Sequence, residues 1–350
     1  MVEQRDIDII IKNPIDWEKF RDKTILVTGA TGRLGMYIAE TLAYADITWN
    51  LNLRIILLAR SGEKLQAVFG ETLRLPNISV LTQDIIKPVE VNSPVDYIFH
   101  TAGAASPKDF TQTPVDTLWG HVMGTRNILE LAKNKRSKQV FYVSTVEIYG
   151  DWQKAECVKE SDMGAISCDI ARSCYPEAKR LCETMLASYG EQYNVSYRGI
   201  RLCHTFGVGI SLDDGRAFAE FIKNVVEGKD IVLRSDGSAK RTYTYTPDAV
   251  GAMFVIATKG KDGEFYNAAN LNNLISVYDL AQLIASLDQT GKTKVKFADT
   301  VDKSGELKYL PFKLGIMNVD KIEKLGWRPQ VGLKDALKRT LEFYQQRCAP

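Results

Sequence analysis

A tyrosine and a lysine lie four residues apart where the sequence takes on a helical period. Tyr175 and Lys179 therefore share one face of a helix expected over 175–193. Because a nearby ammonium stabilises a phenolate, we expect Lys179 to lower the pKa of Tyr175, so that the phenol exchanges a proton with a substrate oxygen near neutral pH. Pairs at this spacing are usually surface residues, so this pair gains weight only from its surroundings.

A second group of polar residues follows an apolar run. The segment 143–150 (VSTVEIYG) leaves a candidate buried strand at its carboxyl end, which is where open parallel sheets place their ligands. The polar side chains there are those of Ser144, Thr145 and Glu147. With the tyrosine and the lysine, these side chains indicate proton transfer at a hydroxyl or carbonyl group.

Three glycines recur at a three-residue spacing directly after another apolar run, 24–28. Such glycines allow a tight turn, let the backbone approach a pyrophosphate and allow close packing of a helix, while the phosphate charge meets the amino end of that helix. Glycines also serve ordinary turns, but a place between a strand and a helix predicts a dinucleotide site. The residues expected to contact the dinucleotide here are Gly29, Thr31, Gly32, Arg33, Leu34 and Gly35.

The end of the second candidate strand predicts which dinucleotide binds. Proteins that bind NAD usually have an acidic residue there, which holds the ribose hydroxyls, but this strand ends in Arg60 and Ser61. A guanidinium offers two parallel donors to a phosphate, so Arg60 and Lys64 would hold the 2′-phosphate of NADP(H), with Ser61 and Arg33 as further candidates. The alternative is that these residues are solvated loop cations.

The residues after the third candidate strand are also expected to contact the cofactor. Asp84 and Ile85 follow the run 78–82 almost directly. The carboxylate of Asp84 could accept a hydrogen bond from the adenine amine, or it could merely end the strand.

Near-continuous apolar runs alternate with helical patterns over the first two thirds of the chain. Such runs are typical of strands covered on both faces, and therefore of parallel strands. The pattern predicts an α/β fold, with a Rossmann-type doubly wound parallel sheet over 1–200, to which part of 240–270 returns, and a smaller mixed α/β substrate-binding domain over 201–350. The expected strands are 24–28, 54–59, 78–82, 95–99 and 140–143, and the clearest expected helices are 115–132, 175–193, 217–226, 277–286 and 333–346.

The composition excludes several classes of protein. Its 45 Lys and Arg against 43 Asp and Glu leave a net charge of +2, too small for binding nucleic acid through phosphate neutralisation. The six cysteines show neither a zinc spacing nor a C-x-x-C pair, so we expect reduced thiols in a cytoplasmic protein, and the three scattered histidines predict no metal site. No apolar run reaches about 18 residues, so we expect no membrane partner.

Together these features resemble the extended short-chain dehydrogenase/reductase family of nucleotide-sugar dehydratases, epimerases, decarboxylases and reductases. The likeness covers about residues 20–345 and is strongest to UDP-glucuronate decarboxylases and 4,6-dehydratases. The shared stretches are 201–207 (RLCHTFG), 213–216 (DDGR), 237–241 (GSAKR) and 245–248 (YTPD). The resemblance implies a Rossmann domain, a nucleotide-sugar domain, a homodimer, and a catalytic triad formed by Thr145, Tyr175 and Lys179. In it, Thr145 would hydrogen-bond the oxygen on which charge develops, and Glu147 would orient the sugar or serve as a base.

The resemblance also implies contacts with the substrate and the cofactor. Arg216 and Arg241 would bind the substrate diphosphate, which suits their forked donors. Alternatively they would form structural ion pairs, for example with Asp213 or Asp248. Small residues over 101–104 would let the cofactor approach closely. The remaining implied contacts are Thr101, Ala102, Gly103 and His204 for the cofactor and, besides Thr145 and Glu147, Ser106 and Thr205 for the substrate.

Departures from the family pattern limit the reaction. In 4,6-dehydratases the strand ends in Thr-Asp-Glu, and the aspartic acid protonates the leaving hydroxyl. Here Val146 replaces that aspartic acid and cannot move a proton, so dehydration is not expected. His121 and His204 replace two asparagines that are usual in the family.

The leading hypothesis is NADPH-dependent reduction of the C4 ketone of a nucleotide-linked 4-keto-6-deoxyhexose, of the dTDP-linked type used for surface polysaccharide. An enzyme that consumes NADPH stoichiometrically is more naturally a net reductase than one that recycles a tightly held NAD. The second hypothesis is UDP-glucuronate decarboxylation, or epimerisation, with recycled NAD. A third hypothesis is a non-catalytic NADP-binding protein, against which the complete triad argues.

Overall fold

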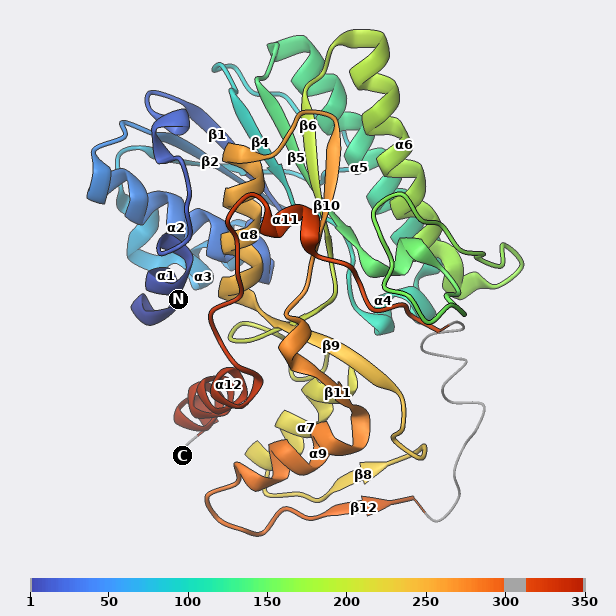
Figure 1. Cartoon of the computed structure of the whole chain (residues 1–350). Coiled ribbons are helices and arrows are strands. Elements are labelled where there is room, and N and C mark those ends of the chain that lie inside the picture. The colour runs from blue at the N-terminus through green and yellow to red at the C-terminus, as the bar shows by residue number, and fades with distance from the viewer. Residues whose placement is uncertain (1, 299–312, 349–350) are drawn as a thin grey trace.

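A parallel sheet of seven strands lies at the centre of the computed structural model, which describes residues 2–298 and 313–348 (Figure 1). Its strands are β1 (Thr24–Thr28), β2 (Arg54–Ala59), β3 (Ile78–Thr82), β4 (Tyr97–His100), β5 (Gln139–Thr145), β6 (Tyr197–Leu202) and β10 (Glu264–Ala268). All neighbours run parallel, in the order β10-β6-β5-β4-β1-β2-β3. The strand order reverses between β1 and β4, where doubly wound sheets bind their ligands.

Helices cover both faces of this sheet (Figure 1). The α-helices of the described residues are α1 (Gln4–Ile11), α2 (Arg33–Trp49), α3 (Gly62–Phe69), α4 (Pro107–Gln112), α5 (Pro114–Lys135), α6 (Cys174–Tyr193), α7 (Ala217–Val226), α8 (Thr246–Lys259), α9 (Val277–Ser286), α11 (Asp320–Glu323) and α12 (Leu333–Cys348), of which α7, α9 and α12 belong to the smaller part described next. Because successive side chains of a strand point to opposite faces, Ile25 and Val27 of β1 join the core formed with α2 and α8, whereas Leu26 joins the core formed with α5 and α6.

The second half of the chain forms a smaller part with two sheets of its own, in the lower half of Figure 1. Their strands are β7 (His204–Phe206), β8 (Ile231–Leu233), β9 (Lys240–Tyr245), β11 (Leu274–Ser276) and β12 (Val295–Phe297). Phe218, Ile222 and Leu280 centre a separate core that includes residues of α7, α9 and α12. Within 240–270, β9 belongs to this part, while α8 packs on the large sheet and β10 joins it. The domain boundaries themselves stay a prediction.

The sequence patterns predicted the fold class correctly. Three strands, 24–28, 54–59 and 78–82, and two helices, 217–226 and 277–286, have the expected bounds. Two strands of the large sheet, β6 and β10, were not predicted, and β5 continues past the apolar run because the polar residues Ser144 and Thr145 still pair with β6. Thr145 is therefore the last residue of a fully buried strand.

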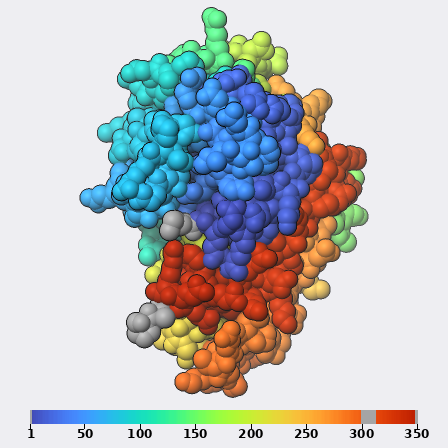
Figure 2. Space-filling model, turned by 90° about the vertical axis from the view of Figure 1, so that its left-hand side faces the viewer, coloured from blue at the N-terminus to red at the C-terminus, as the bar shows by residue number. Residues whose placement is uncertain are grey.

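An amino-terminal helix that the apolar pattern did not predict joins the two parts of the molecule. Asp6 of α1 is fully buried and accepts hydrogen bonds from the hydroxyls of Tyr37, at 2.6 Å, and Tyr245, at 2.9 Å. Ile10 packs into the core with α2 and α8, whereas Ile9 packs into the core of the smaller part. Figure 2 shows this face, with the blue amino-terminal region directly against the red carboxyl-terminal region.

A buried histidine fixes the end of β4 against its neighbours. His100 is 2% exposed, and its Nδ1 lies 2.8 Å from Thr28 Oγ1 of β1 while its Nε2 lies 3.3 Å from Thr125 Oγ1 of α5. Burial, and then the nearby charge of Lys179, lowers the pKa of His100 to about 3. The imidazole is therefore neutral at physiological pH and serves as a structural link.

We expect the stability of the protein to fall between pH 7 and pH 5 partly because of His100. A histidine in the unfolded chain has a pKa of about 6.5, so the unfolded state binds the proton first and gains about 2 kcal/mol over this interval. His100→Gln removes this contribution. Urea unfolding of both proteins at the two pH values should show the smaller loss in the variant, and equal losses would contradict a neutral buried imidazole.

Candidate active site

The glycine turn joins the end of β1 to the start of α2. Gly29 has a φ of +64°, a left-handed conformation that favours glycine, and its carbonyl accepts the N–H of Gly32 at 2.8 Å. A Cβ on Gly29 would lie 2.8 Å from the backbone of Ala102, and a Cβ on Gly35 would overlap the Gly29 carbonyl. The turn is therefore too tight for side chains, and the amino end of α2 stays accessible to an anion.

The residues after β2 lie beside this turn. The N–H of Ala30 donates to the carbonyl of Leu58 at 3.1 Å, which joins the turn to the end of β2. Ser61 caps α3 by accepting the N–H of Lys64 at 3.2 Å, and Arg60 and Lys64 are exposed. The structure thus brings the three expected phosphate ligands of β2 together on an accessible loop.

Arg33 does not join them. Its Nη1 donates to Thr246 Oγ1 of α8 at 3.0 Å, so its guanidinium is directed towards α8 rather than towards the loop after β2. Burial, together with the positive charge of Arg216, lowers the pKa of Arg33 to about 10, and Asp214 opposes this shift. Arg33 is therefore better placed to link the glycine turn to the smaller part than to hold a 2′-phosphate.

The residues after β3 lie at the edge of the candidate cofactor site. The carboxylate of Asp84 accepts the N–H of Ile86 at 3.2 Å, and the carbonyl of Ile85 accepts Nδ2 of Asn127 on α5 at 2.9 Å. Asp84 Oδ1 therefore stabilises its own turn. Within the described residues, Oδ2 accepts no hydrogen bond and can accept one from an adenine amine.

Small residues follow β4. Thr101 Oγ1 donates to the carbonyl of Thr28 at 2.6 Å, and the N–H of Ala102 donates to Thr28 Oγ1 at 3.3 Å. Gly103 has a φ of +147° and lies against the ring of His121. These contacts hold the backbone after β4 against the glycine turn, as close approach of a cofactor requires.

Tyr175 lies at the start of α6 in a buried aromatic wall. Its ring, 8% exposed, stacks on Phe110 of α4 with centroids 4.2 Å apart and an angle of 16°. Thr145 at the end of β5 lies close enough to the phenol to lower its pKa. Lys179 Nζ lies 5.9 Å from the centroid of the Tyr175 ring, one helical turn further on. The three residues of the expected triad are thus brought together.

The expected effect of the lysine on the tyrosine does not occur in this structure. Burial raises the pKa of Tyr175 to about 12, and the charge of Glu147 adds to that shift, while Thr145 opposes it. Lys179 Nζ instead donates to the carbonyl of Val143 at 2.7 Å. Burial lowers the pKa of Lys179 to about 8. The spacing was correct, but the ammonium is directed at β5 and not at the phenol.

Glu147 lies in a short 3-10 helix, Val146–Tyr149, directly after β5 and pairs with an arginine that the sequence analysis missed. Arg172 Nη2 lies 3.1 Å from Oε1 and 3.0 Å from Oε2 of Glu147. Arg172 lies three residues before Tyr175 in the chain. This short distance from the candidate catalytic tyrosine is the sequence feature that could have indicated it. Phe110 was also missed, because its contact depends on the fold.

Arg216 reaches from the smaller part to the loop after β4. It pairs with Asp214, at 3.1 Å, and donates to the carbonyl of Ala105. The alternative of a structural ion pair therefore holds for Arg216, but with Asp214 and not with Asp213, which pairs with Lys223. The carboxylate of Asp248, on α8, accepts the N–H groups of Gln330 and Val331.

Arg241 and the remaining substrate candidates line the same side of the molecule. Arg241 Nη1 donates to the carbonyl of its neighbour at 2.9 Å, and its charge acts on both Glu147 and His204. Burial, then Arg241 and Arg216, lowers the pKa of His204 to about 3. Ser106 caps α4, and Thr205 pairs with β9 inside β7, so both are held by secondary structure.

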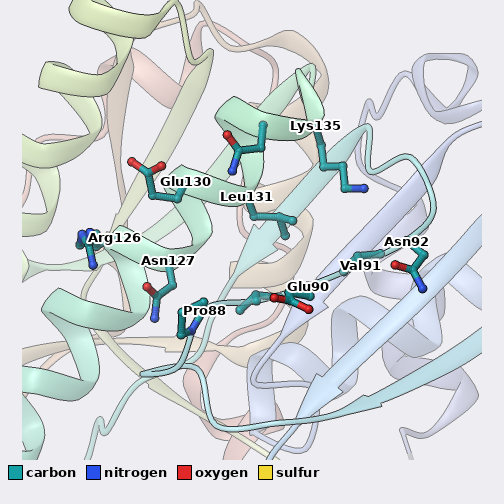
Figure 3. A pocket seen from close by; sticks show the side chains of 11 residues that line it. Pro88, Glu90, Val91, Asn92, Arg126, Asn127, Glu130, Leu131 and Lys135 are labelled. Atoms are coloured by element: carbon teal, nitrogen blue, oxygen red, sulfur yellow. The ribbon is translucent and has the colours of Figure 1, made fainter.

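Of two hollows in the described structure, only the smaller one is lined by residues of this group. A small one of about 20 Å³ is lined by Val146, His204 and Arg241 among others. A larger one of about 440 Å³ lies between α5 and residues 88–92, lined by Arg126 and Glu130 but by none of the residues of the triad (Figure 3).

Over residues 2–298 and 313–348, no group of three His, Cys, Asp or Glu could hold a metal ion. The helices of this described part include none that is long and apolar enough to cross a membrane.

Fold and site together define a dinucleotide-binding Rossmann protein. The glycine turn at the amino end of α2, the basic loop after β2 and the small residues after β4 fit a nicotinamide dinucleotide. The family model described as "NAD dependent epimerase/dehydratase family" matches residues 25–269, which is more than half of the chain. The chain therefore belongs to this family.

Similar proteins agree with this assignment. UDP-glucuronic acid decarboxylase 6 of Arabidopsis thaliana is 28% identical over 328 residues, covering 92% of this chain and 89% of the relative. The solved UDP-glucose 4-epimerase of Thermotoga maritima has a TM-score of 0.77 at 22% identity, covering 93% of this chain and all of that one. The dTDP-glucose 4,6-dehydratase DesIV of Streptomyces venezuelae, solved with NAD bound, has a TM-score of 0.76 at 22% identity, covering 92% and 97%.

We expect Gly35→Ala to weaken binding of a nicotinamide dinucleotide by at least about tenfold, since its Cβ would overlap the carbonyl of Gly29 and force the turn open. Gly120→Ala in α5 is the matched control, because a Cβ there meets no atom within 4 Å. The control should bind normally and gain about 0.5–1 kcal/mol of stability. Fluorescence titration with reduced cofactor checks this, and equal affinities would remove the glycine turn from the binding site.

Proposed function

We propose that the protein removes CO2 from a nucleoside-diphosphate hexuronate of the UDP-glucuronate type, with a nicotinamide cofactor that is reduced and reoxidised within one turnover. One observation carries this proposal: Tyr175, Thr145 and Lys179 meet in one buried wall, and the carboxylate that acts on Tyr175, Glu147, is already paired with an arginine. The decarboxylase relative aligns with 92% of the chain, which supports the same reaction.

Oxidation at C4 is the first step that these residues serve. The phenol of Tyr175 first gives its proton to solvent, the resulting phenolate takes up the proton of the C4 hydroxyl, and Thr145 hydrogen-bonds the sugar oxygen while charge develops on it. A bound nicotinamide supplies the acceptor for the C4 hydride and later returns that hydride. The positive charges of Arg216 and Arg172 lower the pKa of the phenol and stabilise its phenolate form electrostatically.

Loss of CO2 follows from the C4 ketone. The bond between C5 and C6 breaks, CO2 leaves, and the electron pair of that bond moves to the C4 oxygen as an enolate. Thr145 and the protonated Tyr175 donate hydrogen bonds to that oxygen. C5 then takes up a proton from water, which restores the ketone. Arg216 and Arg241 hold the substrate diphosphate through their forked donors.

A second candidate function is the NADPH-dependent reduction of a nucleotide-linked 4-keto sugar. The observation that favours it is the loop after β2, where exposed Arg60 and Lys64 stand without a carboxylate at the strand end. Such a loop suits a 2′-phosphate, and an enzyme that takes up NADPH is suited to net reduction.

Two further expectations belong to the proposal. Large apolar side chains on α5 and α6 are exposed, among them Val115, Trp119 and Leu181, which supports a homodimer formed through these helices. A nucleotide-sugar substrate supports action in the cytoplasm, where such substrates are made.

One experiment separates the candidates. The protein is mixed with UDP-glucuronate and catalytic NAD or NADP, and separately with a dTDP-4-keto-6-deoxyhexose and NADPH. Release of CO2 with formation of a UDP-pentose, read by mass spectrometry, supports decarboxylation, whereas a stoichiometric fall in the near-ultraviolet absorbance of NADPH supports reduction. Binding of the cofactor with no turnover of either sugar would support a non-catalytic protein instead.

We expect Tyr175→Phe to lower turnover by about 10²–10⁴-fold, because the ring packing against Phe110 is kept while the proton acceptor is lost. Substrate affinity, measured by calorimetry, should change little. Turnover equal to that of the native protein would remove Tyr175 from the chemistry.

We expect Arg60→Ala to lower the affinity for NADPH by about 10–100-fold, the loss that follows from removing a charge-assisted contact, with little change for NADH. Arg74→Ala is the control, since Arg74 is an exposed arginine that pairs with Glu71 after α3. Titrations of all three proteins with both cofactors give the comparison. An equal change for NADH and NADPH would show that the loop does not bind a 2′-phosphate.

A further inference from the structure

A buried ion pair closes the sugar end of the candidate site. The side chain of Arg172 is 5% exposed and that of Glu147 is 15% exposed, and they approach within 3.0 Å. Arg172 lies in a short 3-10 helix, Ala171–Ser173, that leads into α6, whereas Glu147 follows β5. The pair therefore ties the two segments that carry Tyr175 and Thr145 to each other.

Arg172 also belongs to the aromatic wall around the phenol. Its guanidinium carbon lies 4.6 Å from the centroid of the Phe110 ring, and that ring stacks on Tyr175. A guanidinium held by an aromatic face and a carboxylate has little freedom to move. Glu147 is in turn the charged group with the largest effect on Tyr175. Arginine, ring, phenol and carboxylate thus form one continuous group.

We infer that Arg172 is a positioning residue that keeps Glu147 as an ionised, oriented hydrogen-bond acceptor for a sugar hydroxyl beside Tyr175. This inference rests on the proposed function only in that a sugar occupies the space next to the phenol. It assigns Glu147 the role of an acceptor, or of a base, and not that of a proton donor. None of the sequence motifs assigned any role to Arg172.

The charges around Glu147 explain why its partner matters. Burial raises the pKa of Glu147 above its ordinary value, while Arg172, Arg216 and Arg241 oppose that shift, in this order. The phenol of Tyr175 and the thiol of Cys174 are the other titratable groups that interact with this carboxylate. Of the three arginines, Arg172 makes the direct contact within the described structure.

Removal of Arg172 should therefore shift the pKa of Glu147 in a defined direction. A buried carboxylate that loses its cation favours its neutral form, so the pKa of Glu147 rises. The part of the acid limb of kcat/KM that is lost in Glu147→Gln reports the ionisation of this carboxylate; we expect that part to move to higher pH, so that activity falls most on the acidic side. Activity on the alkaline plateau, where the carboxylate is ionised in either protein, is retained more fully.

The experiment compares pH profiles of the native protein with those of Arg172→Gln and Arg172→Lys. We expect the acid limb to move up by about one pH unit or more in the glutamine variant and by less in the lysine variant, which restores a cation. In the Glu147→Gln background this limb is absent, and Arg172→Gln should then produce no further shift. An unshifted limb in Arg172→Gln would overturn the inference.

Arg180→Gln is the matched control for a merely structural role. Arg180 of α6 donates to the carbonyls of Ile148 and Gly164, both at 2.7 Å, so it anchors the turn of Glu147 without touching its carboxylate. We expect this variant to lower thermal stability without shifting the acid limb. If Arg180→Gln shifts the limb as far as Arg172→Gln, the effect is structural and the inference fails.

A readout without turnover separates this inference from the proposed function. Carboxyl ¹³C NMR of protein labelled at glutamate, with Glu147→Gln used to assign the resonance, follows the ionisation of Glu147 directly. The titration should move to higher pH in Arg172→Gln even if no sugar nucleotide is converted. A titration that is the same in both proteins would overturn the inference, whatever the enzyme does with UDP-glucuronate.

Discussion

Burial of ionisable groups at the carboxyl edge of the sheet is the constraint on which the site depends. Water is excluded from Tyr175 and Lys179, and the result is a phenol with a pKa of about 12 and an ammonium with a pKa of about 8. At neutral pH both therefore carry their protons in the absence of ligand. A phenolate formed during reaction would appear among cations, because Arg216 and Arg172 both lower the pKa of that phenol. The protein thus disfavours the anion at rest and surrounds it with charges that can stabilise it.

The parallel sheet makes this arrangement possible, since it brings the ends of β1, β4 and β5 to one edge. Thr28 shows how closely they are held: its hydroxyl contacts His100 and the N–H of Ala102, and its carbonyl accepts from Thr101. The backbone after β4 therefore lies against the glycine turn, and a Cβ on Gly29 would meet Ala102. A dinucleotide at this edge would extend from the amino end of α2 towards the phenol on α6. The smaller part supplies the opposite side, where Arg216 reaches the loop after β4.

Local patterns predicted what is local in the structure. Apolar runs gave the strands, the glycine spacing gave the turn, and a four-residue spacing placed Tyr175 and Lys179 on one face of α6. What the sequence could not predict depends on side-chain direction or on partners far along the chain. The lysine ammonium is directed at the carbonyl of Val143, and Arg172 finds its carboxylate 25 residues earlier in the chain. Helix α1 was missed for the same reason, because its buried Asp6 depends on tyrosines from two distant segments.

The single carboxylate at the end of β5 bears on the class of reaction. Elimination of a hydroxyl needs an acid that protonates the leaving group, and the position where one would stand is occupied by Val146, which is 5% exposed. Glu147 next to it is paired with Arg172, which favours an anion that accepts rather than donates. Loss of CO2 makes no such demand, because the leaving molecule is neutral and the electron pair moves to an oxygen beside Thr145 and Tyr175. A site with hydrogen-bond donors at C4 and no acid at the leaving group is therefore better suited to decarboxylation, or to simple hydride transfer, than to dehydration.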